Sequence, residues 1–127
     1  MATRPSFTSG DVFTAANANI LATSIVALNT QAGTAYTAAL TDVGKLISFT
    51  SGTAVAFTIP ANATVAFAVG DQINIYQAGT ATATITPAAT VTVRSSGAKL
   101  KTNDQFSVAT CIKIDTNEWI ALGNLKA

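Results

Sequence analysis

The chain has 127 residues, of which 49% are apolar and only 10% charged, and its formal net charge is +1. This length suits one compact domain with a core of its own, and the charged fraction is far below the about 25% that is typical. Near-neutrality argues against electrostatic binding of nucleic acid, which needs clustered Lys and Arg. The chain has no long apolar run and no apolar signal segment near its start. We therefore expect neither a membrane partner nor Sec-dependent export.

The sequence offers little catalytic chemistry. It contains no histidine, which excludes Ser-His-Asp and Cys-His nucleophiles and the usual His-containing zinc sites. The single cysteine, Cys111, cannot form an intramolecular disulfide. The acidic residues fall mostly at predicted turns, where Asp is common, and there is no glycine-rich phosphate loop. We therefore expect a protein that is not an enzyme, with no catalytic residue, cofactor or metal.

Residues 1–13 are predicted to form an extended arm. Pro5 excludes a regular helix at this position. Phe7, Val12 and Phe13 are large apolar side chains in a segment that has little else to bury them. Because exposed aromatic groups on a terminal arm need a partner, the arm either folds back on the body or docks on a neighbour.

Residues 14–23 are the one helical candidate, with Thr14 as the N-cap and several alanines that favour helix. Residues 29–33 are expected to be a short linker. Residues 1–30 are thus interpreted as an attachment segment. Its candidates for subunit or capsid contacts are Phe7, Val12, Phe13 and Ile20.

Residues 31–127 are predicted to form a single β-domain. Short segments with alternating apolar and polar residues recur at close spacing. Alternation favours antiparallel strands, because parallel strands are usually apolar on both faces. We expect an antiparallel β-sandwich or small barrel of roughly eight strands, and no solenoid, since no repeat of fixed period is visible. The predicted strands cover residues 34–40, 45–50, 54–59, 71–77, 81–86, 90–94, 106–114 and 118–122.

A β-hairpin is predicted near the end of the chain, over residues 106–122. Its first strand has two faces, of which one carries Val108, Thr110, Ile112 and Ile114, and the other carries Ser107, Ala109, Cys111 and Lys113. Its second strand contains Trp119, the only tryptophan, which we interpret as a core anchor because it buries a large area.

Two further groups of side chains have a structural and a functional interpretation. Arg94, Lys99 and Lys101 form the only local basic group, and solubilising side chains on an exposed edge are favoured over a phosphate-binding track. Tyr36, Tyr76 and Trp119 could stack on sugars or bases, but packing in the core or at an interface is favoured. Two roles stay open at this point: a structural shell component, and a recognition domain that binds cell-surface glycans through its loops.

Parts of the sequence resemble known virion proteins. The stretch Thr8-Ser-Gly-Asp-Val-Phe-Thr-Ala-Ala-Asn-Ala-Asn19 resembles an opening found on small tailed-bacteriophage virion proteins. Residues 39–47, 59–73 and 109–123 resemble the β-domain shared by phage tail fibres, head fibres and capsid decoration proteins. The resemblance implies a virion structural protein, commonly a homotrimer, whose N-terminal segment attaches while its β-domain faces out.

The sequence departs from tail-fibre proteins because it has no collagen-like stretch, long heptad stalk or β-helical shaft. A capsid decoration (cement) protein therefore fits better than a fibre. The expected partners are further copies of the chain and a major capsid protein. The expected location is the outer capsid surface of a virion that is assembled in the host cytoplasm. The alternative is a head- or tail-fibre module that recognises a host-surface glycan.

Overall fold

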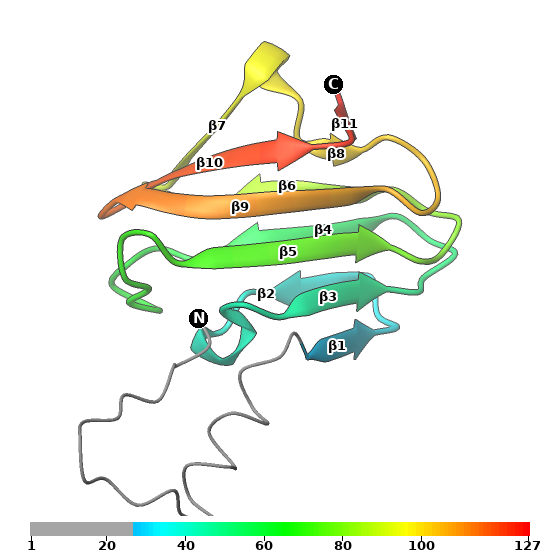
Figure 1. Cartoon of the computed structure of the whole chain (residues 1–127), viewed down its shortest axis with the longest axis horizontal. Coiled ribbons are helices and arrows are strands. Elements are labelled where there is room, and N and C mark those ends of the chain that lie inside the picture. The colour runs from blue at the N-terminus through cyan, green and yellow to red at the C-terminus, as the bar shows by residue number, and fades with distance from the viewer. Residues whose placement is uncertain (1–26) are drawn as a thin grey trace, which may run out of the picture.

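The computed structural model describes residues 27–127, which form two facing β-sheets (Figure 1). The arm at residues 1–13 and the expected helix at residues 14–23 lie outside the described residues. Two short 3₁₀ turns are present, η1 (Leu40–Asp42) and η2 (Ser96–Ala98). The strands are β1 (Leu28–Gln31), β2 (Ala35–Thr37), β3 (Leu46–Phe49), β4 (Val55–Ile59), β5 (Gln72–Gln77), β6 (Ala83–Pro87), β7 (Thr92–Ser95), β8 (Lys101–Thr102), β9 (Val108–Asp115), β10 (Glu118–Gly123) and β11 (Leu125–Lys126).

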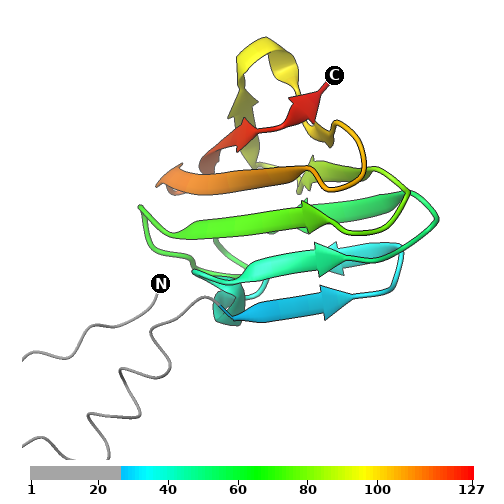
Figure 2. The same ribbon diagram turned by 45° about the vertical axis from the view of Figure 1, so that its right-hand side comes forward.

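The first six strands alternate between the two sheets, so the chain coils through both layers (Figures 1 and 2). In one layer β1 pairs with β3 and β3 with β5, and all three strands run parallel. In the other layer β2, β4 and β6 are parallel in the same way. Each strand therefore lies opposite its successor in the chain.

The remaining strands complete both layers with mostly antiparallel pairs. β9 pairs antiparallel with β5, β10 antiparallel with β9, and β7 parallel with β10. In the second layer β8 is antiparallel to β6, and β11 is antiparallel to β8. The six-stranded sheet has the order β1-β3-β5-β9-β10-β7, and the five-stranded sheet has the order β11-β8-β6-β4-β2.

The prediction of a mainly β structure is confirmed, but the prediction of purely antiparallel sheets is wrong. Parallel neighbours here are joined through the opposite sheet rather than through helices that would cover the outer faces. Each sheet therefore keeps one face in solvent, and its strands alternate as antiparallel strands do. Residues 27–127 also contain eleven strands rather than roughly eight. One of them, β1, occupies most of the segment expected to be a linker at residues 29–33.

The core lies between the sheets and is built from alternate side chains of each strand. Val55, Phe57 and Ile59 of β4 point inward, as the alternation predicted. Tyr36 stacks on Phe57 with ring centroids 6.5 Å apart. The largest fully buried apolar side chains are Trp119, Phe49, Phe57, Ile47, Ile59, Ile73, Ile75 and Ile85.

Buried polar groups link the layers. Gln77 at the end of β5 and Thr102 of β8 belong to different sheets, and the Thr102 hydroxyl donates a hydrogen bond to Oε1 of Gln77. The backbone N–H of Ala83 donates to the same hydroxyl oxygen at 2.9 Å. Because these groups are fully buried, the bonds offset the cost of removing them from water.

Candidate interaction surface and pocket

The six-stranded sheet carries an exposed apolar patch on its outer surface. Because β9 buries Ala109, Cys111 and Lys113, its alternate residues must face outward. The same alternation holds in β10, where Trp119 and Ala121 are buried. We define the outer apolar face by five residues of these two strands: Val108, Ile112, Ile114, Ile120 and Leu122.

The outer apolar face is open to solvent and nearly free of charge. Val108, Ile114 and Leu122 are 45%, 41% and 50% exposed. The charged groups beside it are Arg94 of β7 and Glu118 of β10, which form an ion pair with each other, and the exposed Asp115 at the end of β9, which stands opposite Glu118. A partner that covers the centre of this face would therefore displace water from apolar side chains without burying a charge.

The large aliphatic side chains of β9 and β10 thus lie on the outer surface and not in the core. Sequence alternation identified the two faces of residues 106–114 but did not decide which one is buried. Small groups at Ala109 and Cys111 fit the space left by the large side chains of the opposite sheet. The apolar residues of the outer face are free to contact a partner.

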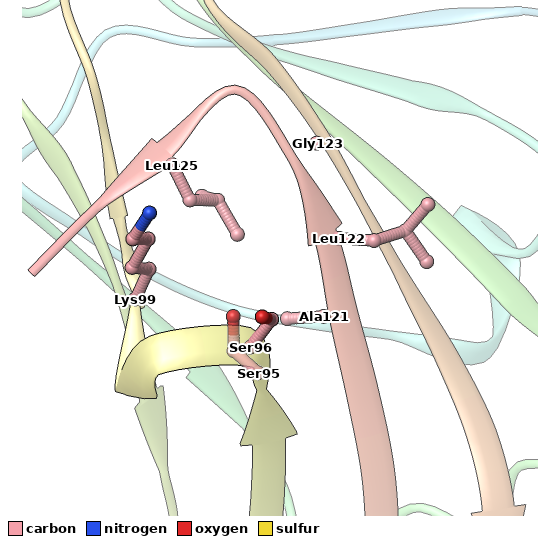
Figure 3. Close-up of a pocket in the computed structure, with 7 residues that line it drawn as sticks. All are labelled: Ser95, Ser96, Lys99, Ala121, Leu122, Gly123 and Leu125. Carbon is pink, nitrogen blue, oxygen red and sulfur yellow. The ribbon is translucent and has the colours of Figure 1, made fainter.

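A small pocket lies next to this face (Figure 3). It has a volume of about 200 Å³. Its walls come from η2 with its flanks, the end of β10 and the start of β11, so distant segments meet here. Gly123 has φ +128, and a Cβ there would lie 2.6 Å from the carbonyl oxygen of Val108, so glycine allows this close approach. The lining residues are Ser95, Ser96, Lys99, Ala121, Leu122, Gly123 and Leu125.

A second unusual feature is a buried lysine. Lys113 is 2% exposed. Its Nζ donates hydrogen bonds to Oδ1 of Asn62 and to the carbonyl oxygen of Phe67, both at 2.7 Å. The amine thus ties β9 to the loop that connects β4 with β5. No alternation rule predicted this, because a lysine in a strand is normally placed on the solvent side.

Trp119, interpreted from the sequence as a core anchor, is 1% exposed. Its ring packs edge-on against Phe67 at a centroid distance of 5.3 Å. Lys113 lies directly across from Trp119 in the register of β9 and β10. The indole and the lysine therefore hold the same loop against the body.

A hydrogen-bonded group joins the first two strands. The buried carboxylate of Asp42 accepts hydrogen bonds from the Tyr36 hydroxyl at 2.7 Å and from the Asn29 amide at 2.8 Å. Burial and, next, the neighbouring carboxylate raise the pKa of Tyr36 above its usual value. The group ties β1, β2 and η1 together, which gives Tyr36 and Asp42 a structural role.

Cys111 and the two acidic residues Asp115 and Glu118, which stand opposite each other in the β9–β10 pair, are the reactive groups of the hairpin. Cys111 is buried, and this burial raises its pKa to about 12, which keeps it a protonated thiol at neutral pH. Asp115 accepts a hydrogen bond from the backbone of Thr116, and Glu118 pairs with Arg94. Within residues 27–127 no group of three His, Cys, Asp or Glu residues is placed to hold a metal ion.

The four sequence candidates for subunit or capsid contacts, Phe7, Val12, Phe13 and Ile20, lie outside the described residues. In the part that the structure describes, no helix is long and apolar enough to cross a membrane. No family model, curated protein or solved structure matches this chain.

Proposed function

We propose that this protein is a non-enzymatic structural component of a tailed-bacteriophage virion, a capsid decoration (cement) protein that sits on the outer capsid surface as a homotrimer. The observation that carries the proposal is the outer apolar face. It gives a protein with very few charges a surface suited to permanent contact rather than to solvent.

The energetics favour such contact. Burying apolar surface contributes roughly 25 cal/mol per Å², and interfaces between permanently associated subunits are more apolar than the rest of a protein surface. Arg94 and Glu118 beside the face pair with each other, and Asp115 lies at the edge of the face. Copies of the same face can therefore meet at its apolar centre without repulsion. The number three comes from the resemblance to phage virion proteins.

The two ends of the chain have separate tasks in this proposal. The outer apolar face joins copies of the β-domain to one another. The arm, through Phe7, Val12 and Phe13, contacts the major capsid protein, and Ile20 adds a contact with the capsid or a sister subunit. A module that gains stability by burying surface across neighbouring capsid subunits needs both contacts.

Binding to purified capsids that lack the protein tests this role. The full chain is expected to cosediment with the capsids, in hundreds of copies spread over the head. The double variant Phe7→Ser/Phe13→Ser is expected to lose binding while its circular dichroism spectrum stays unchanged. Phe106→Ser is the matched control, because Phe106 is an exposed phenylalanine of the β-domain, 67% exposed. Full occupancy by the double variant, or only a handful of copies confined to the tail, would contradict the proposal.

A head- or tail-fibre module that binds a host-surface glycan is the second candidate role. The observation that favours it is the pocket beside Lys99.

A further inference from the structure

The pocket combines polar and apolar walls in a way that suits a particular ligand class. The Ser95 and Ser96 hydroxyls and the Lys99 amine provide its polar groups, and Ala121 and Leu125 provide apolar surface, whereas the Leu122 side chain points away from the pocket (Figure 3). In Figure 3 both serine oxygens lie between Ala121 and Lys99, and the lysine amine lies beside Leu125. Among residues 27–127, these two hydroxyls and this amine make no side-chain hydrogen bond with another protein group. They are therefore available to a ligand.

The corner around the pocket is more basic than the chain as a whole. Residues 27–127 contain six Lys and Arg side chains, of which Lys99 lines the pocket and Lys101 and Lys126 belong to the β8–β11 pair next to it. Lys101 and Lys126 stand directly opposite each other in the β8–β11 pair. Like charges directly across a strand pair destabilise it, so an anion nearby would relieve the repulsion.

No acidic side chain offsets these lysines within the described residues. The only ion pair there joins Arg94 and Glu118. Asp104, the acid closest to Lys101 in sequence, accepts a hydrogen bond from the Ser107 hydroxyl at 3.0 Å. Lys99, Lys101 and Lys126 therefore make no ion pair with an acidic side chain among residues 27–127.

We propose that this pocket binds a uronic acid residue of an anionic polysaccharide. The Lys99 amine pairs with the sugar carboxylate, and Lys101 and Lys126 strengthen the attraction from outside the pocket. The serine hydroxyls, which both donate and accept hydrogen bonds, match the hydroxyl groups of the sugar. Ala121 and Leu125 pack against the carbon face of the ring. This site is independent of capsid decoration, since neither the arm nor the centre of the outer apolar face takes part.

The lining favours a sugar acid over a free phosphate. Phosphate sites usually provide several backbone N–H groups or a bidentate arginine. Here the one arginine of residues 27–127, Arg94, is engaged by Glu118. One ammonium, two hydroxyls and apolar walls instead suit a singly charged, hydroxyl-rich ring.

Backbone amide NMR of the full chain, titrated with methyl glucuronide, tests the proposal. Methyl glucoside serves as the uncharged comparison and sodium sulfate as the anion without a sugar. The expected result is a saturable shift of the amides of residues 95–99 and 121–125 with the glucuronide. The glucoside is expected to bind at least about tenfold more weakly, since charge-assisted hydrogen bonds are the stronger ones. Raising the salt concentration should weaken glucuronide binding, because the lysines are exposed.

Two variants test whether the charge of Lys99 is needed for glucuronide binding. Lys99→Gln is expected to weaken glucuronide binding about tenfold, as loss of one charge-assisted contact predicts. Lys45→Gln, which removes the same charge away from the pocket, should bind as the unmodified chain does. The proposal is overturned if the glucuronide causes no shift at the pocket, if glucoside or sulfate reproduces it equally well, or if the two variants bind alike. Capsid binding by Lys99→Gln is expected to be normal, so either proposal can fail without the other.

Discussion

Ile120 of β10 stands directly opposite Ile112 of β9, and both side chains point out of the sandwich. In a free monomer, this cross-strand pair would place two large aliphatic groups side by side at the surface. Such pairs usually stabilise the buried face of a sheet. Their position on the solvent face leaves them available to the further layer that the proposed assembly would supply.

Placing a charge in this pair should separate the copies. Ile120→Asp is expected to reduce the assembly to a single chain of 12.9 kDa, because the interface would have to bury a carboxylate. Sedimentation velocity measures the change. Thr86→Asp is the matched control, since Thr86 is exposed on the other sheet. Equal assembly of both variants would show that the outer apolar face is not the interface.

Removing the buried indole should destabilise the domain strongly. Trp119→Ala is expected to lower the free energy of unfolding by about 3–5 kcal/mol, because the vacated space would lie beside Phe67 in the core. Phe106→Ala, at an exposed aromatic position, should change it by less than about 0.5 kcal/mol. Urea denaturation measures both. A Trp119→Ala variant of normal stability that had lost a binding function would instead make the hairpin a functional site.

The buried lysine should hold the loop between β4 and β5. Lys113→Met is expected to cost about 1–3 kcal/mol, because it leaves the carbonyl of Phe67 and the amide oxygen of Asn62 without their donor. Hydrogen exchange in residues 61–69 should accelerate. Lys45→Met, at the half-buried Lys45, is the comparison. The interpretation fails if exchange in the loop is unchanged in Lys113→Met.

The thiol of Cys111 should make stability depend on alkaline pH. Its pKa is raised from 9.0 to about 12 by burial, so the unfolded chain loses the proton first. The contribution of this thiol to the free energy of unfolding is complete below pH 9. It is lost as the pH rises toward 12, with a slope of up to about 1.4 kcal/mol per pH unit. Cys111→Ala should flatten this part of the profile.

Tyr36 is the control for that profile. Its pKa is also raised on folding, so it too lowers stability at alkaline pH, but only above its ordinary pKa of 10.0. Tyr36→Phe should leave the slope between pH 9 and 10 in place. If Cys111→Ala and the unmodified chain lose stability in parallel over that interval, the thiol does not cause the loss.

Local patterns predicted the strands well but not their arrangement. The alternation in residues 54–59 correctly predicted both the strand β4 and its buried face. The turn residues Asp115 to Asn117 correctly predicted the position of the hairpin. Parallel pairing could not be predicted, because strands joined through the opposite sheet alternate as antiparallel ones do. The coil shows no fixed period because its connecting loops differ in length.

The functional features were harder to predict, because they depend on contacts between distant segments. In β9 both faces contain apolar residues, so the buried face was decided by the volume left by the other sheet. The pocket unites residues 95–99 with residues 121–125, and the repulsive pair Lys101 and Lys126 appears only once β11 is placed beside β8. The burial of Lys113 depends on the loop at Asn62 and Phe67, which is far away in sequence.

The mass of the full-length protein in solution tests the central claim, that the outer apolar face joins copies of this chain, most directly. Sedimentation equilibrium is expected to give three times the 12.9 kDa mass of the chain at micromolar concentration. In that assembly, hydrogen exchange in β9 and β10 should be slower than in the Ile120→Asp variant. A mass of a single chain at every concentration tested would contradict the account.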